Sequence, residues 1–235
     1  MTMSSTGFPF LKSGYTVYAN HLCPFSMHVR RALKAVGATH QTVEIDLSNK
    51  PSWYSQVNPK LLVPALRTPD GTVVTESMGI IEHVVGAFPS SKLIPEDPAQ
   101  RTRLYDFINI IDSRFRPSVY KSLMASDPDA QKASIDLALS AVREASKALE
   151  DQWALPGSNG GPFWLDARFG FAEIVLSSSV SVLGVLRHYR GVEIPDTQAY
   201  AAFLCWYSAF KSDPLFTEFE PDFEEQVVTF KKIVA

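Results

Sequence analysis

The sequence predicts a small α/β domain followed by an all-helical domain. Three observations lead to this fold class. Short β-prone runs alternate with helical patterns in the first part of the chain, a stretch with three prolines and two serines follows, and strand signals are absent after it. We therefore expect an α/β domain at residues 1–88, with an ordered fold from about residue 15, a linker at 89–100 and a helical domain at 101–235.

The first half of the α/β domain has the pattern of a strand–helix–strand unit. Residues 16–19 are β-prone, and the stripe from Phe25 to Val36 repeats apolar residues at spacings of three and four, which is typical of a helix with one apolar face. Gly37 is a suitable helix stop. Residues 42–47 alternate apolar and acidic side chains and predict a strand with one buried face. Such a crossover should be right-handed, with parallel strands.

The second half of this domain has the pattern of a hairpin and a helix. Residues 65–68 and 72–75 are β-prone and are joined by Pro-Asp-Gly, which favours a turn. Glu76 and Ser77 then open a second helical pattern. We expect a mixed sheet with helices packed on its faces.

In the helical domain, apolar residues recur at helical spacing. One stripe spans Leu104 to Phe115, after which Pro117 should bend or end the helix, and a second spans Ile135 to Leu149. Residues 156–161 predict a loop, and further helices are expected at about 172–189, 196–211 and 222–233.

Composition and charge exclude several classes of protein. The 235 residues are 46% hydrophobic and 20% charged, as is ordinary for a globular protein, and the net charge of −3 argues against a nucleic-acid partner. Two cysteines make neither a disulfide framework nor a cysteine-rich zinc site, and the five histidines lack ligand spacing. We expect no metal and a reducing compartment.

No segment has the pattern of a secretory signal or a membrane span. The most apolar stretch, residues 171–186, contains Glu173 and four serines and predicts a buried helix. We therefore expect a cytoplasmic protein without a membrane span.

Cys23 lies where the first strand should pass into the first helix, in the run His-Leu-Cys-Pro-Phe-Ser. Proline favours the first helical position, so Cys23 is expected at or beside the N-cap, where the helix end lowers a thiol pKa and favours the nucleophilic thiolate. Ser26 occupies the place of the second cysteine of a Cys-x-x-Cys motif, so Cys23 would exchange with the thiol of a small molecule. The alternative is that Cys23 is a small buried apolar residue.

The N-terminal part resembles an omega-class glutathione transferase. The resemblance rests on CPF at the helix start, NKPxW after the second strand, NPxxLVPAL before the third and ES after the fourth, and it spans most of residues 16–98. The second half resembles the family more loosely, through its helical content, HYRG and the pattern W-x4-K-x-DP from Trp206 to Pro214. Chloride-intracellular-channel-like proteins and plant dehydroascorbate reductases share the fold, but NKPxW and LVPAL favour the omega class.

This resemblance implies a thioredoxin-like N-terminal domain, an all-helical C-terminal domain, a homodimer and a site for glutathione as co-substrate. Cys23 matches the catalytic cysteine that forms a mixed disulfide with glutathione. Trp206 matches a tryptophan of the electrophile pocket, which would lie mostly in the helical domain. The matching glutathione-binding positions are Phe25, beside the tripeptide; Lys50, for a carboxylate; Val63, for the cysteinyl backbone; Pro64, in the cis form; and Glu76 and Ser77, for the γ-glutamyl end.

Elementary chemistry agrees with these roles. Lys50 supplies a positive charge, the helix N-terminus at Ser77 can hold a carboxylate, and Glu76 can pair with an ammonium group. Taken singly, each residue has a plainer interpretation: Ser77 as a helix cap, Lys50 as a solvated lysine, Glu76 as a surface charge, and Trp206, Tyr207 and Phe210 as core residues. Their joint spacing favours the site.

Several positions depart from the family pattern. Ser26 replaces a small apolar residue and could donate a hydrogen bond to the sulfur of Cys23. Leu61 replaces a glycine, which leaves the conformation of its loop open. Gly170 and Glu173 replace the usual capping residue and aspartate of the core helix, which weakens a capping box.

The sequence therefore predicts a glutathione-dependent thiol transferase that removes glutathione from mixed disulfides or reduces dehydroascorbate. The alternative is a non-catalytic or weakly catalytic ligand-binding protein that keeps the glutathione site, either a ligandin or a chloride-intracellular-channel-like protein. In both cases the expected partners are glutathione and small-molecule electrophiles, disulfides or hydrophobic ligands. Conjugation assisted by Tyr15 or Tyr18 is less favoured, because neither lies at the turn. Cys205, in an apolar run, is expected to be buried and slow to react.

Overall fold

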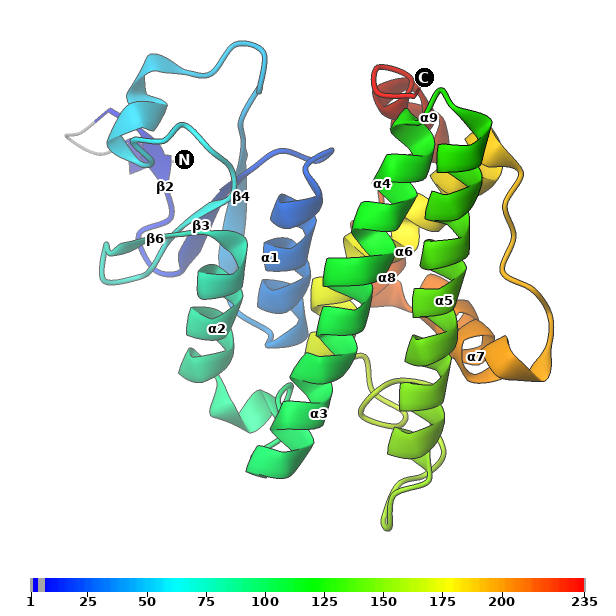
Figure 1. Cartoon of the computed structure of the whole chain (residues 1–235). Coiled ribbons are helices and arrows are strands. Elements are labelled where there is room, and N and C mark those ends of the chain that lie inside the picture. The colour runs from blue at the N-terminus through cyan, green and yellow to red at the C-terminus, as the bar shows by residue number, and fades with distance from the viewer. Residues whose placement is uncertain (1, 4–6, 235) are drawn as a thin grey trace. The chain divides into compact units, whose positions relative to one another are not determined.

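The computed structural model describes residues 2–3 and 7–234, and the chain divides into two compact units, Met1–Leu93 and Ile94–Ala235 (Figure 1). The first unit contains a four-stranded sheet and the second is helical. The expected fold class, an α/β thioredoxin-like domain followed by an all-helical domain, is confirmed.

The sheet of the first unit has the order β4-β3-β5-β6. Strand β3 (Tyr15–Ala19) is parallel to β4 (His40–Glu44) and antiparallel to β5 (Ala65–Arg67), which forms a hairpin with β6 (Val73–Thr75). This is the mixed sheet that the two sequence patterns predict.

Two layers cover this sheet. Helices α1 (Pro24–Ala35) and α2 (Ser77–Ala87) pack side by side against it (Figure 1). Because side chains alternate along a strand, Tyr18 faces away from its neighbours Val17 and Ala19. Tyr18 packs instead on the segment between β4 and β5, which contains the 3-10 helix η1 (Ser52–Gln56).

The second strand differs from its expected range of 42–47. Strand β4 ends at Glu44; Ile45 is buried just beyond it, but Leu47 is 43% exposed. The physical reason is the partner strand, because Glu44 pairs with Ala19 and β3 ends there. The alternation of apolar and acidic residues does not show where the partner strand ends, so it could not predict the end of β4.

The ordered fold begins before residue 15, contrary to expectation. Strand β2 (Pro9–Phe10) pairs with β1 (Thr2–Met3). The ring of Phe8 stacks on Trp53 at a centroid distance of 6.3 Å, and the hydroxyl of Tyr18 donates to the Pro9 carbonyl at 2.9 Å. This segment covers the aromatic side of the sheet.

The second unit consists of helices, with a long irregular connection over residues 154–170 between α5 (Pro128–Trp153) and α6 (Phe171–Arg190). Apolar stripes at the expected spacing are buried in it, including Leu104, Phe107 and Phe115. The other bounds are α3 (Pro98–Asn109), a π-helix η3 (Ile110–Phe115), α4 (Arg116–Met124), α7 (Ala201–Ser212), α8 (Pro214–Thr217) and α9 (Phe223–Phe230), with 3-10 helices η2 (Pro89–Ser91) and η4 (Gln198–Tyr200).

Pro117 does not end the first long helix of this unit. The wider π-helical turn immediately before it accommodates the proline, and the N–H of Arg116 bonds to the carbonyl of Ile111, five residues back. A proline in a regular α-helix would remove a bond and crowd the preceding turn. The helical run therefore continues from α3 through η3 into α4.

Helix α6 forms the centre of the second unit. It is long and apolar enough to pass a composition test for a membrane span, but 67% of the tested window is buried inside the protein, as in a core helix. Its first turn contains Glu173, which is fully buried. One carboxylate oxygen accepts from the Trp164 backbone N–H at 2.9 Å and from the Trp206 indole at 2.8 Å, and the other accepts from the Gly170 N–H at 2.9 Å.

Only one half of the capping box of α6 is present, which agrees with the expectation of a weakened box. Gly170 offers no side chain, but Glu173 still closes back on the N-cap N–H. A β-carbon at position 170 would lie 3.1 Å from the Leu165 side chain, so a larger residue there would require that side chain to shift. Burial raises the pKa of Glu173, while its three N–H donors act in the opposite direction.

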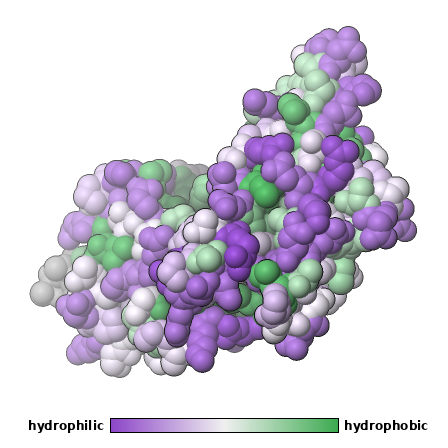
Figure 2. Space-filling model, turned by 60° about the horizontal axis from the view of Figure 1, so that its bottom comes forward, coloured by the Kyte–Doolittle hydropathy of each residue, from purple (hydrophilic) through white to green (hydrophobic). Residues whose placement is uncertain are grey.

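On the face shown in Figure 2, hydrophobic residues form small patches among hydrophilic ones. The larger exposed apolar side chains of the first unit include Phe25 and Leu62, at 44% and 57% exposure. Both lie in the candidate site.

Candidate functional site

Cys23 is the N-cap residue of α1, with Pro24 at the first helical position, as the sequence predicts. Its backbone carbonyl accepts from the N–H groups of Ser26 and Met27 at 3.0 and 3.1 Å. The residue is half-buried, and its sulfur lies 3.8 Å from the carbonyl oxygen of Val63. The thiol is thus held at the start of a helix and next to a backbone acceptor.

Asn20 and Ser26 fix the loop that carries Cys23. The Asn20 side chain donates to the Ile45 carbonyl at 3.1 Å and accepts from the Leu22 N–H at 3.0 Å. The buried hydroxyl of Ser26 accepts from the Asn20 N–H at 3.3 Å. Ser26 therefore stabilises the loop through its bond to Asn20, and among the described residues its hydroxyl forms no hydrogen bond to the sulfur of Cys23. The sequence analysis did not identify Asn20.

The pairing of the strands brings the predicted site segments to one end of the sheet. Cys23 follows β3, and because β5 runs antiparallel to β3, the residues before β5, Val63 and Pro64, lie at the same end. Glu76 and Ser77 follow β6, whose last residue pairs with the first residue of β5. Segments separated by more than 50 residues in sequence thus meet at the carboxyl end of β3.

A cleft of about 250 Å³ lies at this end of the sheet. It unites five of the six residues expected to bind glutathione. Asn58 and Leu62 line it as well, and the sequence analysis did not assign them. The lining residues are Phe25, Asn58, Leu62, Val63, Pro64, Glu76 and Ser77.

Tyr54 and Asn58 hold the loop that forms one wall of the cleft. The Tyr54 hydroxyl and the Asn58 amide both donate to the carbonyl of Leu62, each at 2.8 Å. Tyr54 is fully buried, and burial raises the pKa of its hydroxyl. The Val63–Pro64 peptide bond is cis, as expected. The Asn-Pro pair at 58–59 was the available signal for this turn.

Leu61 adopts the left-handed conformation, with φ of 56°. This conformation favours glycine, which explains why the family pattern has glycine at the position. The Leu61 N–H donates to the Asn58 carbonyl at 2.9 Å, which closes the turn around this residue.

Glu76 and Ser77 begin α2 at the opposite wall. Glu76 is the N-cap, with φ of 66°, and its carboxylate pairs with the Lys60 ammonium at 3.0 Å. Ser77 is the first helical residue rather than the cap, and no side chain caps the helix among the described residues. The N–H groups of the first turn of α2 are therefore available to an anion.

Lys50 does not line the cleft in this structure. It is exposed in the segment after β4, and its ammonium forms no ion pair within the described part of the chain. Its role toward glutathione stays a prediction.

Trp206 and Cys205 are not where the sequence analysis expects them. Trp206 is fully buried, and its indole is bonded to Glu173, so it packs in the core of the second unit with Phe210 and does not line the cleft beside Cys23. Cys205 is exposed, not buried. Helix geometry explains both: Phe203, Trp206 and Phe210 share one face, and Cys205 points away from it.

Tyr15 and Tyr18, the two tyrosines that precede the Cys23 turn, are both buried away from the cleft. The hydroxyl of Tyr18 donates to Pro9, and burial raises its pKa to about 12. Tyr15 is also buried, at the opposite end of β3 from Cys23. Neither lines the cleft. Within the described residues, no three His, Cys, Asp or Glu side chains gather as a possible metal site.

Comparison with known proteins agrees with this geometry. Residues 22–85 match the family model "Glutathione S-transferase, N-terminal domain". Glutathione S-transferase omega-1 of Mus musculus is 41% identical over 87 residues, 37% of this chain and 36% of the mouse protein. The match to the omega-1 relatives of mouse, rat and pig thus spans about a third of their length. A probable glutathione S-transferase of Solanum tuberosum is 25% identical over 90% of this chain and 91% of the potato protein.

Solved structures share the fold of the whole chain. A tau-class glutathione S-transferase from mango, Mangifera indica, superposes with a TM-score of 0.82 at 21% identity, covering 95% of this chain and all of the mango chain. A dehydroascorbate reductase from Chlamydomonas reinhardtii superposes with a TM-score of 0.76 at 18% identity, again over 95% of this chain and all of the other.

The two units and the cleft define the chain as a protein of the glutathione transferase fold with a glutathione transferase N-terminal domain. That N-terminal domain is related to the omega class.

Proposed function

We propose that this protein is a glutathione-dependent thiol transferase of the omega type that acts through Cys23. One observation carries the proposal: the sulfur of Cys23 lies 3.8 Å from the carbonyl of Val63, and Val63 lines a cleft with the residues suited to hold glutathione. Dehydroascorbate is a second candidate substrate, because its reduction uses the same thiol chemistry.

Each group of glutathione has a suitable partner around the cleft. The open N-terminus of α2 at Ser77 suits the γ-glutamyl carboxylate, and the carboxylate of Glu76 suits the ammonium. The backbone of Val63 can pair with the cysteinyl part as an added strand would. The half-exposed ring of Phe25 would pack beside the tripeptide. The exposed ammonium of Lys50 would pair with the second carboxylate of glutathione.

The proposed reaction proceeds by two thiol–disulfide exchanges. The Cys23 thiolate attacks the glutathionyl sulfur of a mixed disulfide; the new sulfur–sulfur bond forms on Cys23, and the substrate leaves as a thiolate. A glutathione thiolate then attacks the Cys23 adduct and releases oxidised glutathione and the Cys23 thiolate. With dehydroascorbate, two glutathione molecules supply the two electrons, and the products are ascorbate and oxidised glutathione.

The exposure of Cys205 determines how the test is designed. Both thiols are accessible to reagents, so an adduct on the wild-type protein would not identify the reactive one. Cys205→Ser should still gain one glutathionyl group on Cys23 from oxidised glutathione and should reduce a glutathione mixed disulfide at close to the wild-type rate. Cys23→Ser should lose this activity even where Cys205 is modified. Intact mass, peptide mapping and the coupled reductase assay give the three readouts.

Full activity of the Cys23→Ser variant would exclude the proposed mechanism. If the wild type binds glutathione but reduces no disulfide and no dehydroascorbate, the ligand-binding alternative replaces the enzyme. Cys23→Ser is also expected to gain weak conjugation of glutathione to aryl halides, because a hydroxyl can stabilise a bound glutathione thiolate.

We also propose that the protein is a homodimer, on the resemblance to the omega class. Light scattering at micromolar concentration should give twice the 26.1 kDa subunit mass. A single-subunit mass would contradict this assembly.

A further inference from the structure

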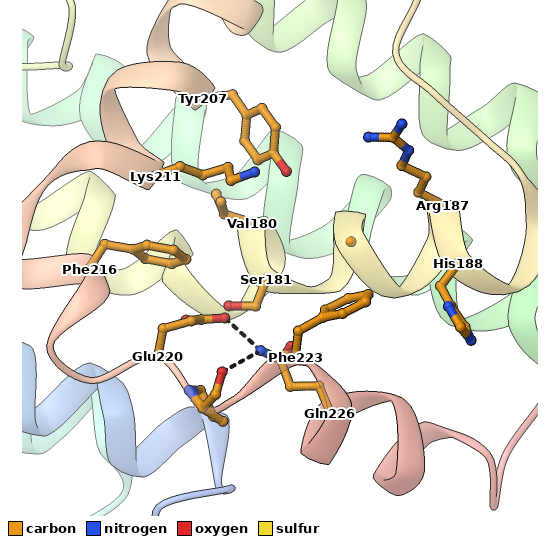
Figure 3. Close-up of a pocket in the computed structure, with 12 residues that line it drawn as sticks. Val180, Ser181, Arg187, His188, Tyr207, Lys211, Phe216, Glu220, Phe223 and Gln226 are labelled. Carbon is orange, nitrogen blue, oxygen red and sulfur yellow. Dashed lines mark hydrogen bonds between the residues drawn. The ribbon is translucent and has the colours of Figure 1, made fainter.

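The second unit contains a cavity of its own, of about 620 Å³, between α6, α7, α8 and α9 (Figure 3). This volume lies in the range of small-molecule pockets. Its lining shares no residue with the cleft beside Cys23. Nothing in the proposed thiol chemistry uses it.

One side of this cavity offers positive charge and a free donor. Figure 3 shows the side chains of Tyr207 and Lys211 together on α7. The Lys211 ammonium lies 5.3 Å from the centre of the Tyr207 ring, and no carboxylate is within ion-pair distance of it among the described residues. The Tyr207 hydroxyl likewise has no hydrogen-bond partner in that part of the chain, and burial raises its pKa, so it stays a donor.

A second cation adds to this side. Arg187, near the end of α6, lines the cavity, and its guanidinium pairs with Glu193 at 2.8 Å while both side chains stay largely exposed. Because an exposed pair of this kind is weak, Arg187 remains able to contact an anion. The charges of Arg187 and Lys211 therefore suit a carboxylate or a similar group.

The middle of the cavity is aromatic and apolar. The rings of Phe216 and Phe223 and the side chain of Val180 line it. Gly184 leaves room for one of these rings, because a β-carbon there would lie 3.1 Å from Phe223. Phe223 is 42% exposed, although it belongs to the cavity wall. A planar aromatic body would cover this surface.

The remaining side is acidic. The carboxylate of Glu220 accepts from the Gln226 amide at 3.0 Å, and Figure 3 shows this pair across the cavity from Tyr207 and Lys211. A carboxylate accepts further hydrogen bonds but repels an anion. A ligand that fits both sides must therefore carry its negative charge at one end and a hydrogen-bond donor at the other.

We infer that this cavity binds hydroxylated aromatic carboxylates, with the carboxylate at Lys211 and Tyr207, the ring system between Phe216 and Phe223, and the hydroxyl at Glu220. All lining residues of this site belong to the second unit and none lines the Cys23 cleft, so the inference stands whether or not the protein is a thiol transferase.

Three matched ligands test the two polar ends. The probe is 6-hydroxy-2-naphthoate; 2-naphthoate lacks the hydroxyl, and 2-naphthol lacks the carboxylate. Calorimetry or probe fluorescence should show one 6-hydroxy-2-naphthoate per chain, with each of the other two binding about tenfold more weakly, the effect of one charge-assisted hydrogen bond. Equal affinity for the three ligands would reduce the site to a nonspecific apolar surface and overturn the inference.

Substitutions then locate the carboxylate. Lys211→Met should weaken both naphthoates about tenfold and leave 2-naphthol unchanged, and Tyr207→Phe should act in the same direction with a smaller effect. Lys231→Met, a lysine outside the cavity, is the matched control and should change nothing. Equal binding by Lys211→Met and Lys231→Met would overturn the assignment.

Competition separates this cavity from the cleft. Saturating glutathione should not displace 6-hydroxy-2-naphthoate from the Cys205→Ser protein. Displacement would place the probe in the N-terminal cleft and contradict the inference. Loss of glutathione binding in a separate experiment would leave the inference untouched and would count only against the proposed thiol transferase.

Discussion

The sulfur of Cys23 lies 3.8 Å from the carbonyl oxygen of Val63, forty residues further along the chain. The pairing of β3 with β5 produces this contact, because Tyr18 is opposite Ala65 and both loops leave the same end of the sheet. A peptide bound along Val63 would therefore present its own sulfur next to Cys23. The contact fixes the reactive sulfur and the peptide-binding backbone relative to each other within one compact unit.

Lys50→Ala should weaken glutathione binding about fivefold, which is the scale of an exposed charge contact. The lysine is solvated and forms no ion pair among the described residues, so its effect should be at the low end for a carboxylate contact. The measurement is the glutathione dissociation constant by calorimetry, with the exposed Lys12→Ala as the control. An unchanged constant would remove Lys50 from the site.

Lys60→Met should have the opposite effect and tighten glutathione binding up to about threefold. The Lys60 ammonium is 3.0 Å from the Glu76 carboxylate and so competes with the ammonium of the ligand for it. The same titration is performed on Glu76→Gln, which should bind more weakly. Weaker binding by Lys60→Met would show instead that Lys60 contacts a carboxylate of glutathione.

Leu61→Gly should raise the free energy of unfolding by about 0.5 to 1 kcal/mol. A left-handed conformation costs a side chain about 1 to 2 kcal/mol, and the greater freedom of glycine in the unfolded chain offsets part of the gain. Leu62→Gly is the matched control, because Leu62 is also exposed but has no positive φ, and it should be destabilised. Urea unfolding measures both. Equal destabilisation would mean that the φ of Leu61 carries no strain.

Glu173 should make stability fall as the pH rises above the ordinary glutamate pKa. Burial raises its pKa in the folded state, so between the two pKa values the folded protein holds a proton that the unfolded chain has released. Stability from this group is complete below the unfolded pKa and is lost as the pH rises through the folded pKa. Glu173→Gln lacks this slope.

The free energy of unfolding of wild type minus that of Glu173→Gln, measured from pH 4.5 to 8 or so, should therefore decrease with pH. The amide loses one of the three acceptor contacts, so the variant should be less stable throughout, and only the slope is diagnostic. An increasing difference would show that the donors of Trp164, Trp206 and Gly170 outweigh burial.

Much of the sheet and of the cleft could be predicted from the sequence. The strand and helix patterns are local, and the motifs around Cys23, Pro64 and Ser77 have fixed spacings, so they identify residues that the topology then unites. The Asn-Pro pair at 58–59 marks a turn, but the bonding partners of Lys60, Tyr54 and Asn58 could not be found this way. Their roles depend on which carbonyl or carboxylate the folded loop places beside them.

The helical unit shows where such reasoning fails. Cys205 and Trp206 are neighbours in one apolar run, but adjacent residues of a helix point about 100° apart, and only Trp206 faces the core. To tell which of the two is buried, one must know which face of α7 points to the core, and Phe203 and Phe210 mark that face. The cavity at Tyr207 and Lys211 was equally hidden, because its walls come from four helices.

The π-helix at Ile110–Phe115 has a consequence for how this chain can change length. A π-helical turn holds one residue more than an α-helix of the same rise, so α3 and α4 keep their own buried faces on either side of it. Deleting one residue here would restore a regular helix without rotating either face. The deletion would also bring Pro117 into that regular helix, against the carbonyl four residues back. The extra residue and the proline are therefore coupled, and a shortened descendant of this sequence should lose both together.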